Sequence, residues 1–198
     1  MIINLTGNGK GKTTSALGTA FRAMGYGKKV CIIQFMKTEN SGEFNFANEL
    51  KTRLNERILI YSFGSEKLIA KNNDAVKELK TRSCFKKLKI KVKTLEDKKL
   101  AKLALKKAHD CLKQKPFLLI LDEINPAVYF GLISKRRVLK FLKNSLENSN
   151  DTNIILTGRN SPKEFIEISD IVSEIRSVKH YFNNKKSNIS APVKGIDF

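Results

Sequence analysis

A glycine- and lysine-rich stretch near the start of the chain limits the possible folds more than any other feature. It reads Thr-Gly-Asn-Gly-Lys-Gly-Lys-Thr-Thr over residues 6–14, directly after an apolar run at residues 2–5. Apolar residues at helical spacing follow it from Thr13 onward. A strand, a glycine-rich turn and a helix in this order are typical of a phosphate-binding loop, or P-loop. The sequence therefore predicts an α/β protein that binds a nucleotide.

The positions of this loop have distinct expected roles. Glycines allow successive backbone N–H groups to point at phosphate oxygens, and the helix N-terminus adds positive potential. Lys12 supplies a cation for the phosphates, and Thr13 supplies a hydroxyl for Mg²⁺. Thr6 stands where the usual pattern has glycine, so the loop is a variant. The residues predicted to bind the nucleotide are Gly7, Asn8, Gly9, Lys10, Gly11, Lys12, Thr13 and Thr14.

Short apolar runs alternate with helical patterns along nearly the whole chain. Besides residues 2–5, the expected strands are 29–35, 58–63, 117–121, 153–156 and 171–175. This alternation is typical of a parallel sheet with crossover helices. A chain of 198 residues with 41% hydrophobic composition can close one sizeable core. We predict a single domain over residues 1–198, a P-loop NTPase-like α/β fold with a mostly parallel sheet of about six strands between two helical layers.

Charged residues follow two of these expected strands. The run at 117–121 ends in Asp122 and Glu123, and adjacent carboxylates at this edge of a sheet can order Mg²⁺ opposite Thr13. Arg159 follows the run at 153–156, where its guanidinium could reach a polyphosphate, although a surface position is an equal alternative. The sequence thus predicts Thr13, Asp122 and Glu123 as metal residues.

Several helix signals are specific enough to name the residues involved. Thr94 is expected to cap a helix that has Asp97 at its third position, and Ser161 to cap one that begins with Pro162. The polar stretch 37–42 is expected to form a mobile loop at the end of the second strand. The stripe expected to be buried on the helix after Thr94 is Leu100, Leu103, Ala104, Ala108, Cys111 and Leu112. The stripe on the helix after the phosphate loop is Ala16, Leu17, Ala20, Phe21 and Met24.

Cysteines and histidines are few and scattered. Cys31, Cys84 and Cys111 lack the spacing of a zinc site or a disulfide framework, so we expect reduced, inert thiols. His109 and His180 are isolated, which argues against a protein-built metal cage or a catalytic triad. No apolar run approaches the length of a membrane span, and the chain opens directly into its first strand. We expect a cytoplasmic protein without a membrane partner.

The formal net charge of +19 is concentrated in one segment. Between Lys77 and Lys115 there are fifteen basic residues and four acidic ones. Thirty of the thirty-eight basic residues are Lys, whereas Arg-rich patches with interleaved aromatics would be the stronger signal for nucleic acid. We interpret the segment mainly as a solvated surface, with an acidic partner or a polyanion as the alternative. Nucleic acid is not the expected partner.

Together these motifs resemble the P-loop type of cob(I)alamin, or corrinoid, adenosyltransferase. The resemblance covers residues 6–14, Gln-Phe-Met-Lys at 34–37, Leu-Asp-Glu at 121–123, Thr-Gly-Arg at 157–159, residues 172–180 and the ending at 194–198. It implies transfer of the 5′-deoxyadenosyl group of ATP to Co(I) of cobalamin or cobinamide, with release of triphosphate. It also implies ATP held in reversed phosphate order, Mg²⁺ as the metal, and a homodimer.

The resemblance also assigns roles to residues. Residues 7–14 would hold the triphosphate, Thr13 and Glu123 would serve the metal with Asp122 beside them, and Arg159 would contact the nucleotide. Lys12 and Arg159 are therefore the predicted catalytic residues. Because cob(I)alamin is itself a strong nucleophile, the reaction needs no catalytic histidine or cysteine.

Two other functions remain open from the sequence. The basic segment 77–115 would suit a P-loop ATPase that acts on nucleic acid. Only Phe63 stands where family members can carry an aromatic cluster, which would suit a non-catalytic nucleotide or corrinoid carrier. For the transferase, the lysine-rich surface could also steer an acidic electron donor such as a flavodoxin.

Overall fold

A six-stranded parallel sheet runs through the centre of the protein in a computed structural model, which describes residues 1–53, 57–81, 89–148, 151–180 and 193–196. The strand order is β3-β2-β6-β7-β1-β8, and every neighbouring pair is parallel. The strands are β1 (Ile2–Thr6), β2 (Val30–Phe35), β3 (Ile58–Phe63), β6 (Leu118–Asp122), β7 (Asn153–Thr157) and β8 (Ile171–Glu174). The six predicted strands are confirmed, each to within one residue at either end.

Each face of the sheet carries its own hydrophobic core, because side chains alternate along a strand. In β2, Cys31, Ile33 and Phe35 join one core, while Val30 and Ile32 join the other. The neighbouring strands β6 and β7 divide in the same way. Strands buried on both faces read as continuous apolar runs, which is why they could be recognised from sequence.

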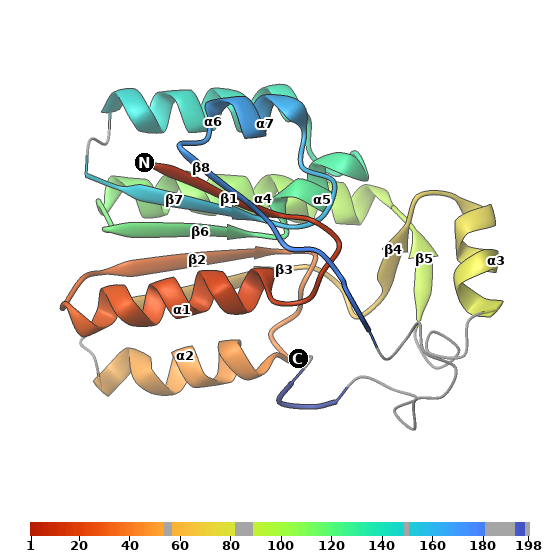
Figure 1. Ribbon diagram of the computed structural model, residues 1–198, viewed down its shortest axis with the longest axis horizontal. Helices are drawn as coiled ribbons and strands as arrows, with labels where there is room; N and C mark the ends of the chain where they lie inside the picture. The colour runs from red at the N-terminus through yellow and green to blue at the C-terminus, as the bar shows by residue number, and fades with distance from the viewer. Residues whose placement is uncertain (54–56, 82–88, 149–150, 181–192, 197–198) are drawn as a thin grey trace.

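Helices cover both faces of the sheet and complete the predicted three layers (Figure 1). One face carries α1 (Lys12–Gly25) and α2 (Gly42–Arg53). The other carries α4 (Leu95–Lys113), α5 (Ile124–Tyr129), α6 (Lys135–Asn148) and α7 (Lys163–Ile168). The Thr94 cap of α4 is confirmed as a capping box, since Thr94 and Asp97 bond each other's backbone N–H groups.

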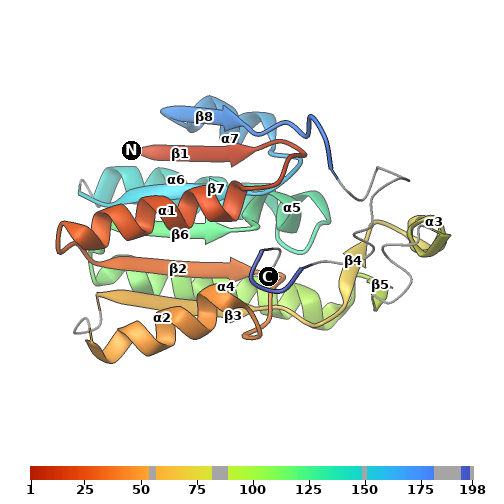
Figure 2. The same cartoon turned by 60° about the horizontal axis from the view of Figure 1, so that its bottom comes forward.

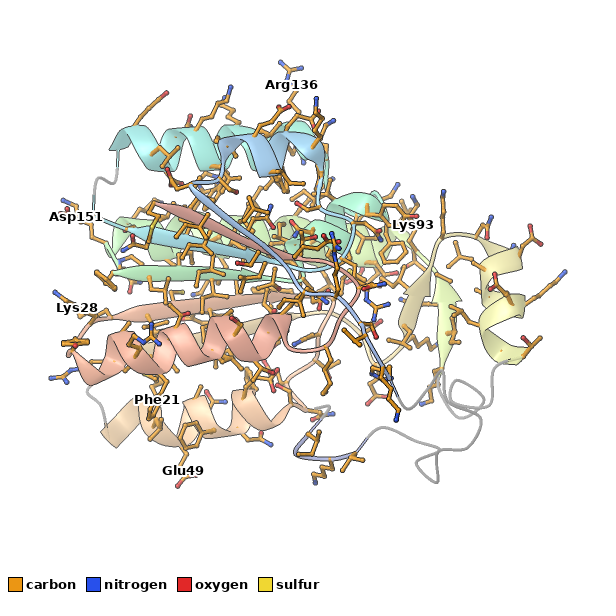
Figure 3. The ribbon with its side chains drawn as sticks, viewed as in Figure 1. Phe21, Lys28, Glu49, Lys93, Arg136 and Asp151 are labelled. Atoms are coloured by element: carbon orange, nitrogen blue, oxygen red, sulfur yellow. The ribbon has the colours of Figure 1, made fainter. Side chains whose placement is uncertain are left out.

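Three details of the helix predictions are wrong. Phe21 is 71% exposed and lies at the surface (Figure 3), while small Ala16, Ala20 and Ala23 let α1 lie close to the sheet. Leu103 was expected to be buried but is 50% exposed, whereas Leu105 on the same helix is buried. Pro162, not Ser161, is the N-cap of α7, because the Ser161 hydroxyl instead accepts a hydrogen bond from the Asn4 amide.

A small lobe that the sequence did not predict stands beyond the carboxyl ends of the strands (Figures 1 and 2). It consists of β4 (Leu68–Ala70), α3 (Asn73–Thr81) and β5 (Ile90–Val92), and its two strands pair in parallel. Two lysines tie it to the rest of the protein. Lys91 Nζ lies 2.7 Å from Asp97 Oδ1 at the start of α4, and Lys93 Nζ donates to the carbonyl oxygen of Phe130.

Two of the three cysteines lie together although they are distant in sequence. Cys31 on β2 and Cys111 on α4 are buried free thiols. Their mutual hydrogen bond, followed by burial, raises the pKa of Cys31, which keeps its thiol protonated and inert. Cys84 lies outside the described residues. Within the part of the chain that the structure describes, no helix is both long enough and apolar enough to cross a membrane.

Candidate functional site

A cavity of about 680 Å³ lies at the carboxyl ends of the strands. The phosphate loop and the charged residues after β2, β6 and β7 form one part of its wall, and apolar side chains from β4 and α5 form another. Its lining includes Gly9, Lys10, Gly11, Lys12, Thr13, Thr14, Met36, Lys37, Glu43, Leu68, Ile69, Glu123, Pro126, Phe130, Arg159, Asn160 and His180. Residues from seven separate segments, including Gly195 and Ile196 near the end of the chain, therefore meet at one place.

The phosphate loop is held in shape by the segment that follows β8. The Gly9 N–H donates to the carbonyl oxygen of Ile175 at 2.7 Å, and the Asn8 side chain accepts from the Ser177 N–H. A Cβ atom on Gly7, whose φ is +95°, would lie 2.4 Å from that same Ile175 oxygen. Gly7 and Asn8 thus pack against the motif at 172–180, whereas residues 9–14 face the cavity. Nucleotide binding by Gly7 and Asn8 stays a prediction.

Lys12 and Arg159 both line the cavity, as their predicted roles require. The Lys12 side chain is 7% exposed and folds back over the loop, where its Nζ donates to the Gly9 carbonyl oxygen at 2.5 Å. Burial, and next the charge of Arg159, lower the pKa of Lys12, while Glu123 and Asp122 oppose this shift. A triphosphate between these cations would relieve their mutual repulsion.

Asp122 lies behind the cavity wall, where it fixes the residues that face the cavity. Its Oδ1 accepts hydrogen bonds from the Thr13 hydroxyl at 2.9 Å and the Thr157 hydroxyl at 2.7 Å. The Thr157 hydroxyl in turn accepts from the Glu123 N–H. Burial favours the neutral acid, but the charge and hydrogen bond of Lys37 prevail and hold the pKa of Asp122 below its usual range. Asp122 therefore remains an anion that orients Thr13.

Glu123 faces the cavity directly and has an unusual backbone conformation. It follows the last residue of β6 with a φ of +60°. Burial, together with the adjacent charge of Asp122, raises the pKa of Glu123. A carboxylate that is buried beside another anion gains most from a nearby cation. Glu123 is thus suited to a metal ion in the cavity.

Three residues of the site had no function predicted from the sequence: Gln34, Lys37 and Glu43. Two of them, Gln34 and Lys37, lie in the motif at 34–37. Lys37 Nζ lies 2.8 Å from Asp122 Oδ2 and 3.3 Å from Glu43 Oε1. The Gln34 amide donates to Glu43 and to Asp122, and accepts from the Ser62 hydroxyl. Gln34 is fully buried in β2, whose other residues are apolar. A polar residue within an apolar run was therefore the sequence signal that could have indicated its function.

Backbone strain gathers around the same cavity. Of the four described non-glycine residues with positive φ, Met36, Glu123 and Asn160 line it. They follow three different strands at the same edge of the sheet. Such conformations are unfavourable and persist where the surrounding structure enforces them, often at functional sites.

The residues around Thr13 fit a magnesium ion. A hydroxyl and a carboxylate supply the oxygen ligands that Mg²⁺ prefers. Among the described residues, no cluster of three or more His, Cys, Asp or Glu side chains could hold a metal. Magnesium at phosphate sites is commonly held by one or two carboxylates together with the substrate phosphates. The donor set therefore suits a magnesium ion that binds together with a nucleotide.

The parallel sheet, the glycine-rich loop between β1 and α1, and the carboxylates after β6 define a P-loop nucleotide-binding protein. The family described as ATP:corrinoid adenosyltransferase BtuR/CobO/CobP matches residues 1–198. The chain belongs to this family of transferases, whose substrates are ATP and a corrinoid. The resemblance seen in the motifs is confirmed.

Individual relatives agree with this assignment. The chain is similar to the corrinoid adenosyltransferase of Escherichia coli strain K12, with 30% identity over 199 residues that cover 100% of this chain and 85% of that protein. Corrinoid adenosyltransferase CobA of Salmonella typhimurium is 29% identical with the same coverage. Among solved structures, the flagellar accessory protein FlaH from Methanocaldococcus jannaschii is similar with a TM-score of 0.48 and 13% identity, over 87% of this chain and 69% of that one.

Proposed function

We propose that this transferase moves the 5′-deoxyadenosyl group of ATP to the Co(I) of a corrinoid and releases triphosphate. The cobalt donates an electron pair to the ribose C5′ carbon, and the C5′–O bond breaks with its electrons leaving on the triphosphate. The cobalt thereby becomes Co(III). The supporting observation is the cavity, which joins the cationic phosphate loop to an apolar wall.

The two parts of the cavity suit the two ends of this reaction. Residues 9–14 line one part and would hold the triphosphate, and ATP in reversed phosphate order would direct C5′ away from the loop. Leu68, Ile69 and Phe130 line the apolar part, where a flat corrin ring could approach that carbon. Alignment of the cobalt with C5′ is a large part of what such a reaction needs from the protein.

The protein's second task is to stabilise the negative charge of the leaving triphosphate. Lys12 and Arg159 supply fixed cations at the cavity, and the amides at the start of α1 add positive potential. We assign Mg²⁺ to Thr13 and Glu123, with Asp122 holding the Thr13 hydroxyl in place. When bound, Mg²⁺ would neutralise further charge on the phosphates.

Product analysis tests this function. The protein is incubated with ATP, Mg²⁺ and chemically reduced cobalamin, and cobalamin spectra and phosphate products are recorded. We expect adenosylcobalamin and triphosphate in equal amounts. Formation of ADP and phosphate, with the cobalamin unchanged, would contradict the proposal.

We further propose a single domain over residues 1–198 that acts as a cytoplasmic homodimer, since ATP and strong reductants are both available in the cytoplasm. Light scattering at several concentrations tests the dimer.

An acidic, flavodoxin-like protein is the proposed electron donor, because Lys99, Lys102 and Lys106 form an exposed basic face on α4. Reduction by such a donor should slow as salt increases, and a rate independent of ionic strength would exclude steering by this face.

A further inference from the structure

Lys37 places a positive charge beside the hydroxyl that is proposed to bind Mg²⁺. It follows Met36, whose φ is +59°, at the end of β2. Its Nζ lies 3.4 Å from Thr13 Oγ1 and 2.8 Å from Asp122 Oδ2. The ammonium group thus lies within contact distance of both the Thr13 hydroxyl and the Asp122 carboxylate that orients this hydroxyl.

The surrounding groups fix the ammonium group at this place. Asp122 is 1% exposed, and its second oxygen is shared between Lys37 and the Gln34 amide. Glu43 accepts from Lys37 at 3.3 Å, and its own position is fixed by Gln34 at 3.0 Å. In the sheet, Gln34 is directly paired with Asp122, so backbone register sets these distances. The side chain of Lys37 is 28% exposed and lines the cavity.

A magnesium ion at Thr13 and this ammonium group would repel each other. Thr13 Oγ1 lies 3.4 Å from Lys37 Nζ. Since Mg²⁺ binds its oxygen ligands at about 2.1 Å, an ion on this hydroxyl would lie at most about 5.5 Å from the ammonium nitrogen. Two positive centres at such a distance repel each other strongly in a site of low dielectric. The oxygens of a triphosphate would change this balance, because they attract the metal and also offer the ammonium group a new acceptor.

We infer that Lys37 acts as a resident cation which keeps divalent metal off Thr13 until a nucleotide brings its own negative charge. The inference rests on the proposed metal site at Thr13 and Glu123. It makes metal and nucleotide bind together, and it neutralises the buried charge of Asp122 before the metal binds. Lys37 is in this sense a positioning residue of the metal site.

Binding of Mn²⁺ without nucleotide tests the inference by electron paramagnetic resonance. We expect Lys37→Met to bind Mn²⁺ at least tenfold more tightly than the wild type, because the positive charge beside Thr13 Oγ1 is then removed. Lys140→Met removes one charge from the exposed face of α6 and should leave the affinity for Mn²⁺ unchanged. Equal or weaker binding by a folded Lys37→Met protein would overturn the inference.

A second variant covers the case in which Lys37→Met does not fold. Lys37→Gln removes the charge but keeps a polar side chain with a hydrogen-bond donor, and the same tenfold gain in Mn²⁺ affinity is expected. Adenosyl transfer by the wild type is measured separately. If the wild type forms adenosylcobalamin while neither variant gains affinity for Mn²⁺, the inference about Lys37 fails and the proposed function stands.

Discussion

The strands that end at the cavity are more deeply buried than the lobe beside them. Every residue of β2 and β6 is buried, and the polar groups at the ends of these strands are bonded to one another. In the lobe, β5 is only half-buried and α3 has no buried residue. Regions with few buried contacts open more easily than a packed core. The charged groups of the site therefore have fixed positions, whereas the lobe offers an apolar wall that can move.

The largest effect is expected from Asp122→Asn in the well-held region. The substitution leaves the Lys37 ammonium group partly buried without its main counter-charge. Removing one partner of a buried ion pair costs about 3–5 kcal/mol in the free energy of unfolding. Urea denaturation measures this change. A loss below about 1 kcal/mol, similar to a surface substitution, would mean that the site is no more firmly held than the lobe.

Lys12→Ala should affect catalysis and leave the fold in place. The ammonium group donates to a carbonyl oxygen of the phosphate loop itself and lines the cavity, so the unfolding midpoint should change little. Loss of one preorganised positive group at a developing charge lowers the rate about 100- to 1000-fold. Single-turnover formation of adenosylcobalamin is the measurement, with Lys140→Ala as a control for charge. A variant that keeps most of the wild-type rate would remove Lys12 from the mechanism.

Gly7→Ala examines how tightly the phosphate loop is packed against the segment after β8. A Cβ atom would lie 2.4 Å from the Ile175 oxygen at a φ of +95°, so the loop must shift. We expect a loss of about 1–3 kcal/mol in stability and weaker ATP binding by calorimetry. Gly18→Ala on α1 is the matched control, because its Cβ meets nothing within 4 Å. That variant should be stabilised by up to about 1 kcal/mol.

The smallest effect is expected at the junction of the lobe, from Asp97→Asn. Burial raises the pKa of Asp97, but hydrogen bonds from Lys91 and Thr94 prevail and lower it. Its stabilising effect is therefore present at neutral pH and lost as the pH falls through this lowered pKa. We expect the substitution to lower the free energy of unfolding by about 1 kcal/mol at neutral pH. Hydrogen exchange in β5 should become faster. Equal loss of protection in β2 would show that the lobe and the sheet open together.

The sheet and the phosphate loop could be predicted because their signals are local. Strands buried on both faces appear as continuous apolar runs, and the loop lies between a strand and a helix. The expected position at the carboxyl edge of the sheet is confirmed for Asp122, which ends β6, and for Glu123 and Arg159, which line the cavity. Fold class and the position of the site follow from these features alone.

The lobe and the Lys37 network could not be predicted, for two physical reasons. The strands β4 and β5 have three residues each, too few for a periodic pattern, and they pair across a long separation in sequence. Lys37, Glu43 and Asp122 meet only because β2 and β6 are neighbours in the sheet. Strand order is set by packing of the whole fold, so no local pattern reveals these contacts.

A crystal structure with Mg²⁺ and ATP would show how the nucleotide lies in the cavity. We predict a triphosphate held by residues 9–14, with the ribose C5′ carbon turned toward Leu68 and Phe130 and accessible to a corrinoid. A nucleotide bound the other way round, with its terminal phosphate directed at that apolar wall, would contradict adenosyl transfer at this site.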